Sequence, residues 1–61
     1  MMQYRIYVTD LAKAQQALTN KGIQSMIQGM YLATNYEAGK TMELIMLLNK
    51  AHVIIYDIEE V

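Results

Sequence analysis

The stretch IQSMIQGMYLAT, residues 23–34, decides the fold of this chain. It is too long for one ordinary strand, and its apolar residues follow no helical periodicity. Gly29 offers the positive φ that a two-residue hairpin turn needs, so Gln28-Gly29 divides the stretch into strands at 23–27 and 30–34. One long, bent strand is the alternative. The sheet therefore has four strands if the hairpin forms and three if it does not.

The residues before this stretch predict a strand followed by a helix. Residues 3–9 (QYRIYVT) alternate between apolar and polar side chains, which is typical of a half-buried strand. Residues 11–21 carry one apolar stripe at helical spacing. Asp10 fits the N-cap of this helix, and Gly22 fits the left-handed position that ends it.

The residues after the stretch predict a second helix and a last strand. Thr34 and Glu37 have the spacing of a capping box, and Asn35 is a rival cap, so we expect the helix to run from here to about Ala51. On an ideal helical wheel four apolar residues face the core, and two others flank the polar strip. The core-facing four are Met42, Leu44, Ile45 and Leu48, and the flanking two are Met46 and Leu47. Residues 52–60 (HVIIYDIEE) then form a strand that is apolar on both faces. Strict alternation puts Val53 and Ile55 on one face and Ile54, Tyr56 and Ile58 on the other.

The predicted order is strand, helix, strand, strand, helix, strand. This order describes a ferredoxin-like α+β fold, with a four-stranded antiparallel sheet and both helices on one face. The alternative, without the hairpin, is a three-stranded β-α-β-α-β arrangement. The chain of 61 residues is one domain, 1–61, and its sequence contains no linker and no repeat.

The composition excludes several classes of function. There is no cysteine, which excludes disulfides and thiolate metal sites. The net charge is −1, with three basic and one acidic residue in 1–36 but two basic and five acidic residues in 37–61, so a strong phosphate-binding face is not expected. The longest apolar run, residues 44–48, is far shorter than the roughly 20 residues that span a bilayer. We therefore expect a cytoplasmic protein without a signal peptide or a membrane segment.

TNYEAGKT, residues 34–41, is similar to a phosphate-binding loop, which reads Gly, four residues, then Gly-Lys-Ser/Thr. Here Thr34 replaces the first glycine, although the tight turn of such a loop needs the conformational freedom of glycine. Glu37 also places a carboxylate among the expected phosphate oxygens. If the capping box forms, Gly39, Lys40 and Thr41 lie inside the helix. Nucleotide binding by a degenerate loop of this kind is the third functional hypothesis.

IYVTDL, residues 6–11, resembles the short motif on the first strand of the RNA-recognition-motif family, with Asp10 in place of the usual Asn. That family shares the predicted order of elements and stacks bases on aromatic residues of its first and third strands. The resemblance implies that Tyr7 is one such platform. In the companion stretch 28–36, Met30 and Leu32 occupy the aromatic positions and Tyr31 falls on the other face. RNA binding is the alternative function.

No set of residues predicts catalysis. His52 stands alone at the start of the last strand, without a Ser, Cys or Asp beside it. Asp57, Glu59 and Glu60 are typical of a solvated acidic end or of a charged edge that blocks strand pairing. We therefore expect no enzyme, no cofactor and no metal site.

The remaining signal is an excess of apolar side chains on surfaces that should be polar. A four-stranded sheet with helices on one side leaves its other face open, and Tyr and Met are favoured at protein interfaces. We predict a small non-catalytic interaction or regulatory module that self-associates as a homodimer, through this open face and the flank of the second helix, or that binds another protein. The candidate interface residues are Tyr7, Met26, Tyr31, Met46, Leu47, Ile55 and Tyr56.

Overall fold

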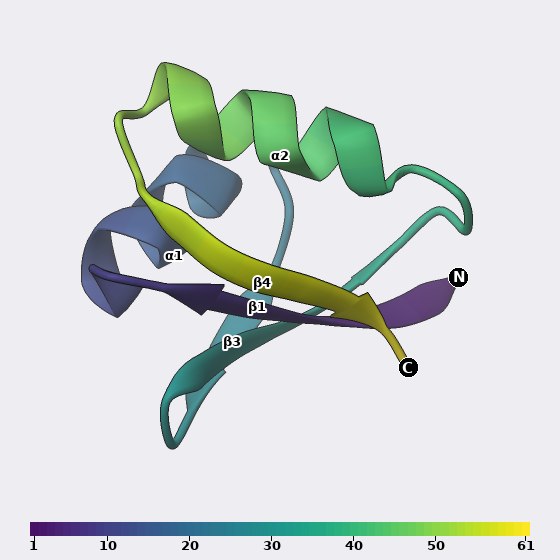
Figure 1. Cartoon of the computed structure of the whole chain (residues 1–61). Coiled ribbons are helices and arrows are strands. Elements are labelled where there is room, and N and C mark those ends of the chain that lie inside the picture. Colours follow the sequence, from purple (N-terminus) through teal and green to yellow (C-terminus); the bar gives the residue numbers. More distant parts are fainter.

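Two helices cover one face of a four-stranded antiparallel sheet in the computed structural model, which describes all of residues 1–61 (Figure 1). The elements are β1 (Met2–Val8), α1 (Leu11–Asn20), β2 (Ser25–Gln28), β3 (Tyr31–Tyr36), α2 (Thr41–Lys50) and β4 (Ile55–Glu60). The strands lie in the order β2-β3-β1-β4, so β2 and β4 form the two outer edges. This is the predicted ferredoxin-like fold, and the three-stranded alternative is wrong.

The decisive stretch forms a hairpin whose turn lies one residue later than predicted. Gln28 is paired with Tyr31, so Gly29 and Met30 make the turn. Gly29 has a φ of 57°, whereas Met30 does not have a positive φ, which is the pattern of a type II′ turn. β2 begins at Ser25 and not at residue 23, because the Ile23 N–H donates to Leu18 O in the turn that ends α1.

The predicted capping box does not form. Thr34 lies in β3, buried, and its hydroxyl donates to the carbonyl of Gln24 at 2.6 Å. β3 continues to Tyr36 because its pairing with β1 extends from Ile6 opposite Leu32 to Met2 opposite Tyr36. α2 therefore begins only at Thr41, and residues 37–40 form a loop.

The two halves of the chain repeat one another in backbone structure, although their sequences do not. The Ile23 N–H donates to Leu18 O at 2.9 Å at the end of α1, and the Val53 N–H donates to Leu48 O at 3.0 Å at the end of α2. Gly22 (φ 75°) and His52 (φ 61°) occupy the same left-handed position in the two halves. The repeat was invisible in the sequence because it rests on backbone geometry and side-chain burial.

The core lies between the helices and the sheet. It comprises Tyr4, Ile6, Val8, Ala14, Leu18, Leu32, Leu44, Leu48 and Val53. Leu44 and Leu48 were predicted correctly, but Met42 is 65% exposed, and Leu47 packs partly buried against the core. The buried arc of α2 is thus rotated from the ideal wheel, since this helix packs against α1 as well as the sheet.

A β-bulge in β4 changes which side chains share a face. Asp57 lies opposite Tyr7, but Ile55 lies opposite Val8, so Tyr56 is an additional residue between them. Because directly paired residues point to the same face, Ile55 lies on the helix side. Ile58, paired with Ile6, lies there too. The predicted strict alternation, which separated Ile55 from Ile58, is therefore wrong.

Candidate interaction surfaces

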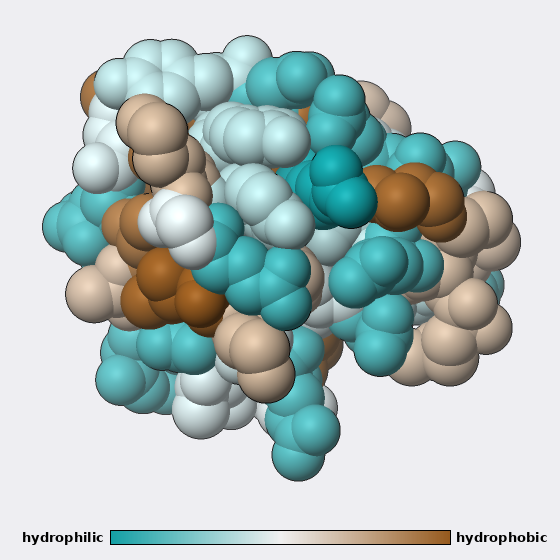
Figure 2. Space-filling model, turned by 90° about the horizontal axis from the view of Figure 1, so that it is seen from below, coloured by the Kyte–Doolittle hydropathy of each residue, from teal (hydrophilic) through white to brown (hydrophobic).

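The face of the sheet that the helices leave open is largely polar. Its side chains, by strand, are Gln3, Arg5 and Tyr7 from β1, Met26 and Gln28 from β2, Tyr31, Ala33 and Asn35 from β3, and Asp57 and Glu59 from β4. Figure 2 looks onto this face, where hydrophilic colours cover most of the area and brown is confined to separate patches. No apolar set of β4 lies on it, because the bulge turns Ile55 and Ile58 toward the helices.

Two tyrosines and an arginine form a cluster on the two central strands of the open face, toward the end of the sheet that holds the β2–β3 turn. The rings of Tyr7 and Tyr31 are tilted by 50°, with centroids 5.4 Å apart. The guanidinium of Arg5 lies 5.3 Å from the Tyr31 ring centroid, within the range of a cation–π contact. Tyr31 thus shares a face with Tyr7. The resemblance to the RNA-recognition motif implied that Tyr31 falls on the other face, and this prediction is wrong. Arg5 was missed, although its alternation with Tyr7 in the strand would have placed it here.

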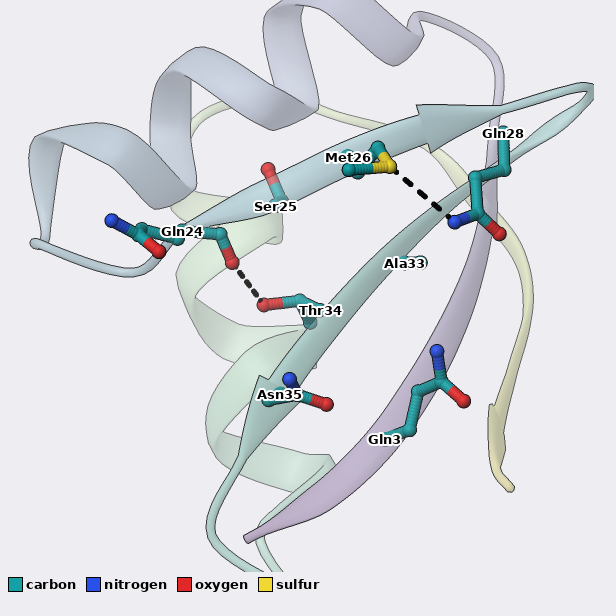
Figure 3. A pocket seen from close by; sticks show the side chains of 8 residues that line it. All are labelled: Gln3, Gln24, Ser25, Met26, Gln28, Ala33, Thr34 and Asn35. Carbon is teal, nitrogen blue, oxygen red and sulfur yellow. Dashed lines mark hydrogen bonds between the residues drawn. The ribbon is translucent and has the colours of Figure 1, made fainter.

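A shallow hollow lies beside this cluster, across β2, β3 and β1 (Figure 3). Its eight lining residues are Gln3, Gln24, Ser25, Met26, Gln28, Ala33, Thr34 and Asn35. Figure 3 shows the amides of Gln3, Gln28 and Asn35 around the small side chain of Ala33. The hollow therefore offers amide donors and acceptors and no charge.

The outer strand β2 carries no charged residue. The chain has none between Lys21 and Glu37. Met26 is 60% exposed and Ile27 is 42% exposed. Charged side chains are one of the devices by which edge strands oppose pairing with another chain, and β2 lacks them.

The other outer strand, β4, combines an apolar surface with an acidic one. Ile54 and Tyr56 are 65% and 73% exposed, beside the partly buried Ile45 of α2. A groove between α2 and β4 is lined by Ile45, Asn49, Val53, Ile54, Ile55, Tyr56, Asp57 and Ile58. Asp57 and Glu59 lie on the opposite, open face of the same strand.

The Asp57 carboxylate also covers part of the β4 edge. Its Oδ1 accepts a hydrogen bond from the N–H of Ile58 at 2.9 Å. The Val61 N–H donates to Gln3 O, so by the alternation of an antiparallel ladder Ile58 and Glu60 direct their backbone groups away from β1. This arrangement agrees with the predicted charged edge.

A further surface lies on the flank of α2. Met46 is exposed and Leu47 partly buried, in a depression that they share with Lys21, Tyr36, Glu43 and Lys50. The Tyr36 hydroxyl donates to Glu43 at 3.0 Å, and Lys40 lies 3.3 Å from the same carboxylate. These two contacts, the Tyr36 hydroxyl foremost, lower the pKa of Glu43.

The loop that is similar to a phosphate-binding loop holds a carboxylate of the chain itself. Glu60 Oε1 accepts the Gly39 N–H at 2.8 Å, and the hydroxyl of the buried Tyr4 accepts the Lys40 N–H at 3.2 Å. The Gly39 N–H and the Tyr4 hydroxyl lower the pKa of Glu60, whereas burial, then Glu60, raise the pKa of Tyr4. The prediction that Gly39, Lys40 and Thr41 all lie inside the helix is wrong, since α2 begins at Thr41. The N–H groups of Gly39 and Lys40 are nevertheless already used within the fold.

The seven predicted interface residues thus lie on three surfaces. Tyr7, Met26 and Tyr31 share the open face, Ile55 and Tyr56 belong to β4, and Met46 and Leu47 belong to the α2 flank. Sequence reasoning missed Ile27 and Ile54 as exposed edge residues, because strand order is a property of the whole sheet.

Comparisons with protein-family models, with curated proteins and with solved structures find no match to this chain. No group of three or more His, Asp or Glu side chains is placed to hold a metal ion. None of the helices has the length and apolar character needed to cross a bilayer.

Proposed function

We propose that this protein is a small non-catalytic interaction module that self-associates through the outer edge of β2. The single observation that carries the proposal is an outer strand without charge, on which Met26 and Ile27 are exposed. The sequence predicted self-association through the open face of the sheet. Because that face is largely polar, we place the contact between copies at its rim, along the outer edge of β2.

The residues of β2 whose backbone N–H and C=O groups point outward are placed for pairing with a second copy. Gln28 and Tyr31 flank a two-residue turn and form a hydrogen-bonded pair, so Ser25 and Ile27 direct their backbone groups to the free edge. In an antiparallel pairing centred on Met26, Ser25 of one copy meets Ile27 of the other, and no charges oppose one another. The Gln15 amide donates to Ser25 O at 3.1 Å, which leaves this carbonyl a second lone pair.

The proposed pairing supplies stability that a domain of this size lacks. Small domains bury a modest share of their surface and often gain stability by association. Burial of a few hundred Å² of apolar surface, at about 25 cal/mol per Å², contributes several kcal/mol before the costs of association. Folding and association are then coupled, so the melting temperature rises with protein concentration.

The test is the solution mass by light scattering over a wide range of concentration. We expect twice the 7.0 kDa of one chain at high concentration. Ile27→Pro removes an N–H that faces the free edge and not β3, so it should give monomers that remain folded. Met26→Lys, which places two like charges opposite one another, should do the same, whereas Met30→Lys in the turn is the control. A mass of 7.0 kDa at every concentration, with a concentration-independent melt, refutes self-association.

A second candidate, the binding of single-stranded RNA, is favoured by the cluster of Tyr7, Tyr31 and Arg5. Aromatic rings on the two central strands, beside uncharged amides, offer stacking and base-edge contacts to unpaired bases. The carboxylates of Asp57 and Glu59 on the same face oppose phosphate, so we rank this function second.

Tyrosine fluorescence tests the second candidate. An unstructured RNA oligomer should quench the emission at low salt, and the quenching should weaken steeply as salt is added. Tyr31→Ala should abolish the response, and Tyr56→Ala, which removes a tyrosine from the β4 edge, should not. Absence of quenching at low salt excludes this function.

A further inference from the structure

The free edge of β4 differs from the free edge of β2 in charge and in the kind of strand that it can pair with. Ile58 and Glu60 direct backbone donors and acceptors to the free edge, as Ser25 and Ile27 do on β2. On β4, however, these groups are flanked by acidic side chains on the open face and by an apolar groove on the helix face.

The carboxylates on the open face have no cation partner within the chain. Both ion pairs of the structure involve Lys40, with Glu37 and Glu43. Arg5 is paired with Glu59 in the sheet register, but its guanidinium lies over the Tyr31 ring, and Glu59 meets only the Tyr7 hydroxyl, at 3.4 Å. Asp57 accepts only the neighbouring Ile58 N–H. Two uncompensated charges therefore lie side by side along this edge.

A second copy fits this edge poorly. Antiparallel pairing centred on Ile58 satisfies the outward backbone groups but places Asp57 of each copy opposite Glu59 of the other. Pairing centred on Glu59 places the two Glu59 side chains opposite one another. Like charges directly opposite are destabilising in a sheet, so β4 excludes the self-pairing that β2 permits.

We propose that β4 is the docking edge for an extended segment of another protein with Lys or Arg at alternate positions. The backbone of this segment adds to the sheet at Ile58 and Glu60, and the Asp57 carboxylate releases the Ile58 N–H to receive it. Its basic side chains lie on the open face, against Asp57 and Glu59. The aliphatic side chains between them cover Ile58 and the groove beside α2. The proposal is independent of self-association through β2.

The experiment uses synthetic peptides of alternating Lys and Val, with peptides of alternating Glu and Val as the charge control. Backbone amide NMR reports where each peptide binds. We expect the Lys-Val peptide to bind, to shift the amide signals of Ile58 and Glu60, and to slow their exchange with solvent. The signals of Ser25 and Ile27 should stay unchanged.

The double variant Asp57→Asn with Glu59→Gln should weaken binding roughly two- to thirty-fold, as expected for the loss of two exposed ion pairs. Glu37→Gln, which removes one charge from the loop before α2, should leave the affinity unchanged. Equal binding of the Glu-Val peptide, binding that leaves the Ile58 and Glu60 amides unperturbed, or no binding at millimolar peptide overturns the proposal. The mass of the peptide-free protein, measured on the same samples, tests self-association separately.

Discussion

The hydroxyl of Tyr4 lies 2.8 Å from the carboxylate of Glu60, although 56 residues separate them in the chain. The same hydroxyl lies 2.7 Å from the carbonyl of Glu37 and accepts the N–H of Lys40. The side chain of Tyr4 has no exposed surface. This contact therefore joins the first strand, the last strand and the loop before α2 at one end of the sheet.

Replacement of Tyr4 by Phe should destabilise the fold. The ring remains in the core, but Glu60 and the Lys40 N–H lose a buried partner. We expect the melting temperature to fall by about 5–15 °C. Tyr56→Phe, on the exposed β4 edge, is the matched control. A Tyr4→Phe variant that melts with the wild type contradicts the role of this hydroxyl.

Acidification should weaken the fold through Glu60. The Gly39 N–H, then the Tyr4 hydroxyl, hold the pKa of Glu60 below its usual range, so its folded pKa lies below its unfolded value of about 4.3. A depressed pKa contributes stability above the unfolded pKa, and this stability is lost as pH falls through the folded pKa. Urea unfolding from pH 7 to pH 3 should show stability falling below about pH 5.

The Glu60→Gln variant should show a shallower decline over the same range of pH. Some decline should remain, because the pKa of Glu43 is also lowered, by the Tyr36 hydroxyl and Lys40. Glu59→Gln removes a carboxylate whose hydrogen bond, to Tyr7 at 3.4 Å, is long, and serves as the comparison. An unchanged pH dependence in Glu60→Gln would show that this carboxylate is not linked to folding.

His52→Gly should stabilise the protein. His52 is the only residue other than glycine with a positive φ, and the equivalent position after α1 is Gly22. Relief of the side-chain strain at a φ of 61° should raise the free energy of unfolding by about 0.5–1 kcal/mol. Gly22→Ala should lower it by about 1 kcal/mol, since a Cβ there meets no neighbour and only the backbone conformation opposes it. Denaturant unfolding of both variants checks the pair.

Met42 and Leu48 of α2 were both predicted to face the core, but their replacement should affect stability differently. Leu48 is fully buried in the core, so Leu48→Ala should cost about 2–5 kcal/mol and leave little of the native state. Met42 is exposed, so Met42→Ala should change the free energy of unfolding by less than about 0.5 kcal/mol. Equal losses in the two variants would contradict the observed rotation of α2.

The order of the elements and the fold were predictable because they rest on local signals. Alternation in residues 3–9, the cap at Asp10 and the glycine of the hairpin each act within a few residues. Thr34 and Glu37 gave an equally clear local signal, and it was wrong. Pairing with β1 holds Thr34 in a strand, so a long-range ladder overrides a local cap.

The candidate surfaces were predictable only in part, because alternation fixes a face but not an edge. Tyr7, Met26 and Tyr31 share the open face as expected from their strands. The bulge at Tyr56 could not be anticipated, since an additional residue in one strand is defined only by the strand opposite. It places Ile55 and Ile58 together on the helix side, whereas strict alternation separates them.

The sequence by itself determined the α+β class, the boundaries of α1, the hairpin and the absence of charge between Lys21 and Glu37. Only the tertiary structure decided that this uncharged segment supplies one outer strand and that the acidic segment supplies the other. It also decided that Tyr4 and Glu60 meet. The physical reason is range: turn, cap and periodicity energies arise between near neighbours, whereas strand order and buried polar contacts depend on residues that only the folded chain brings together.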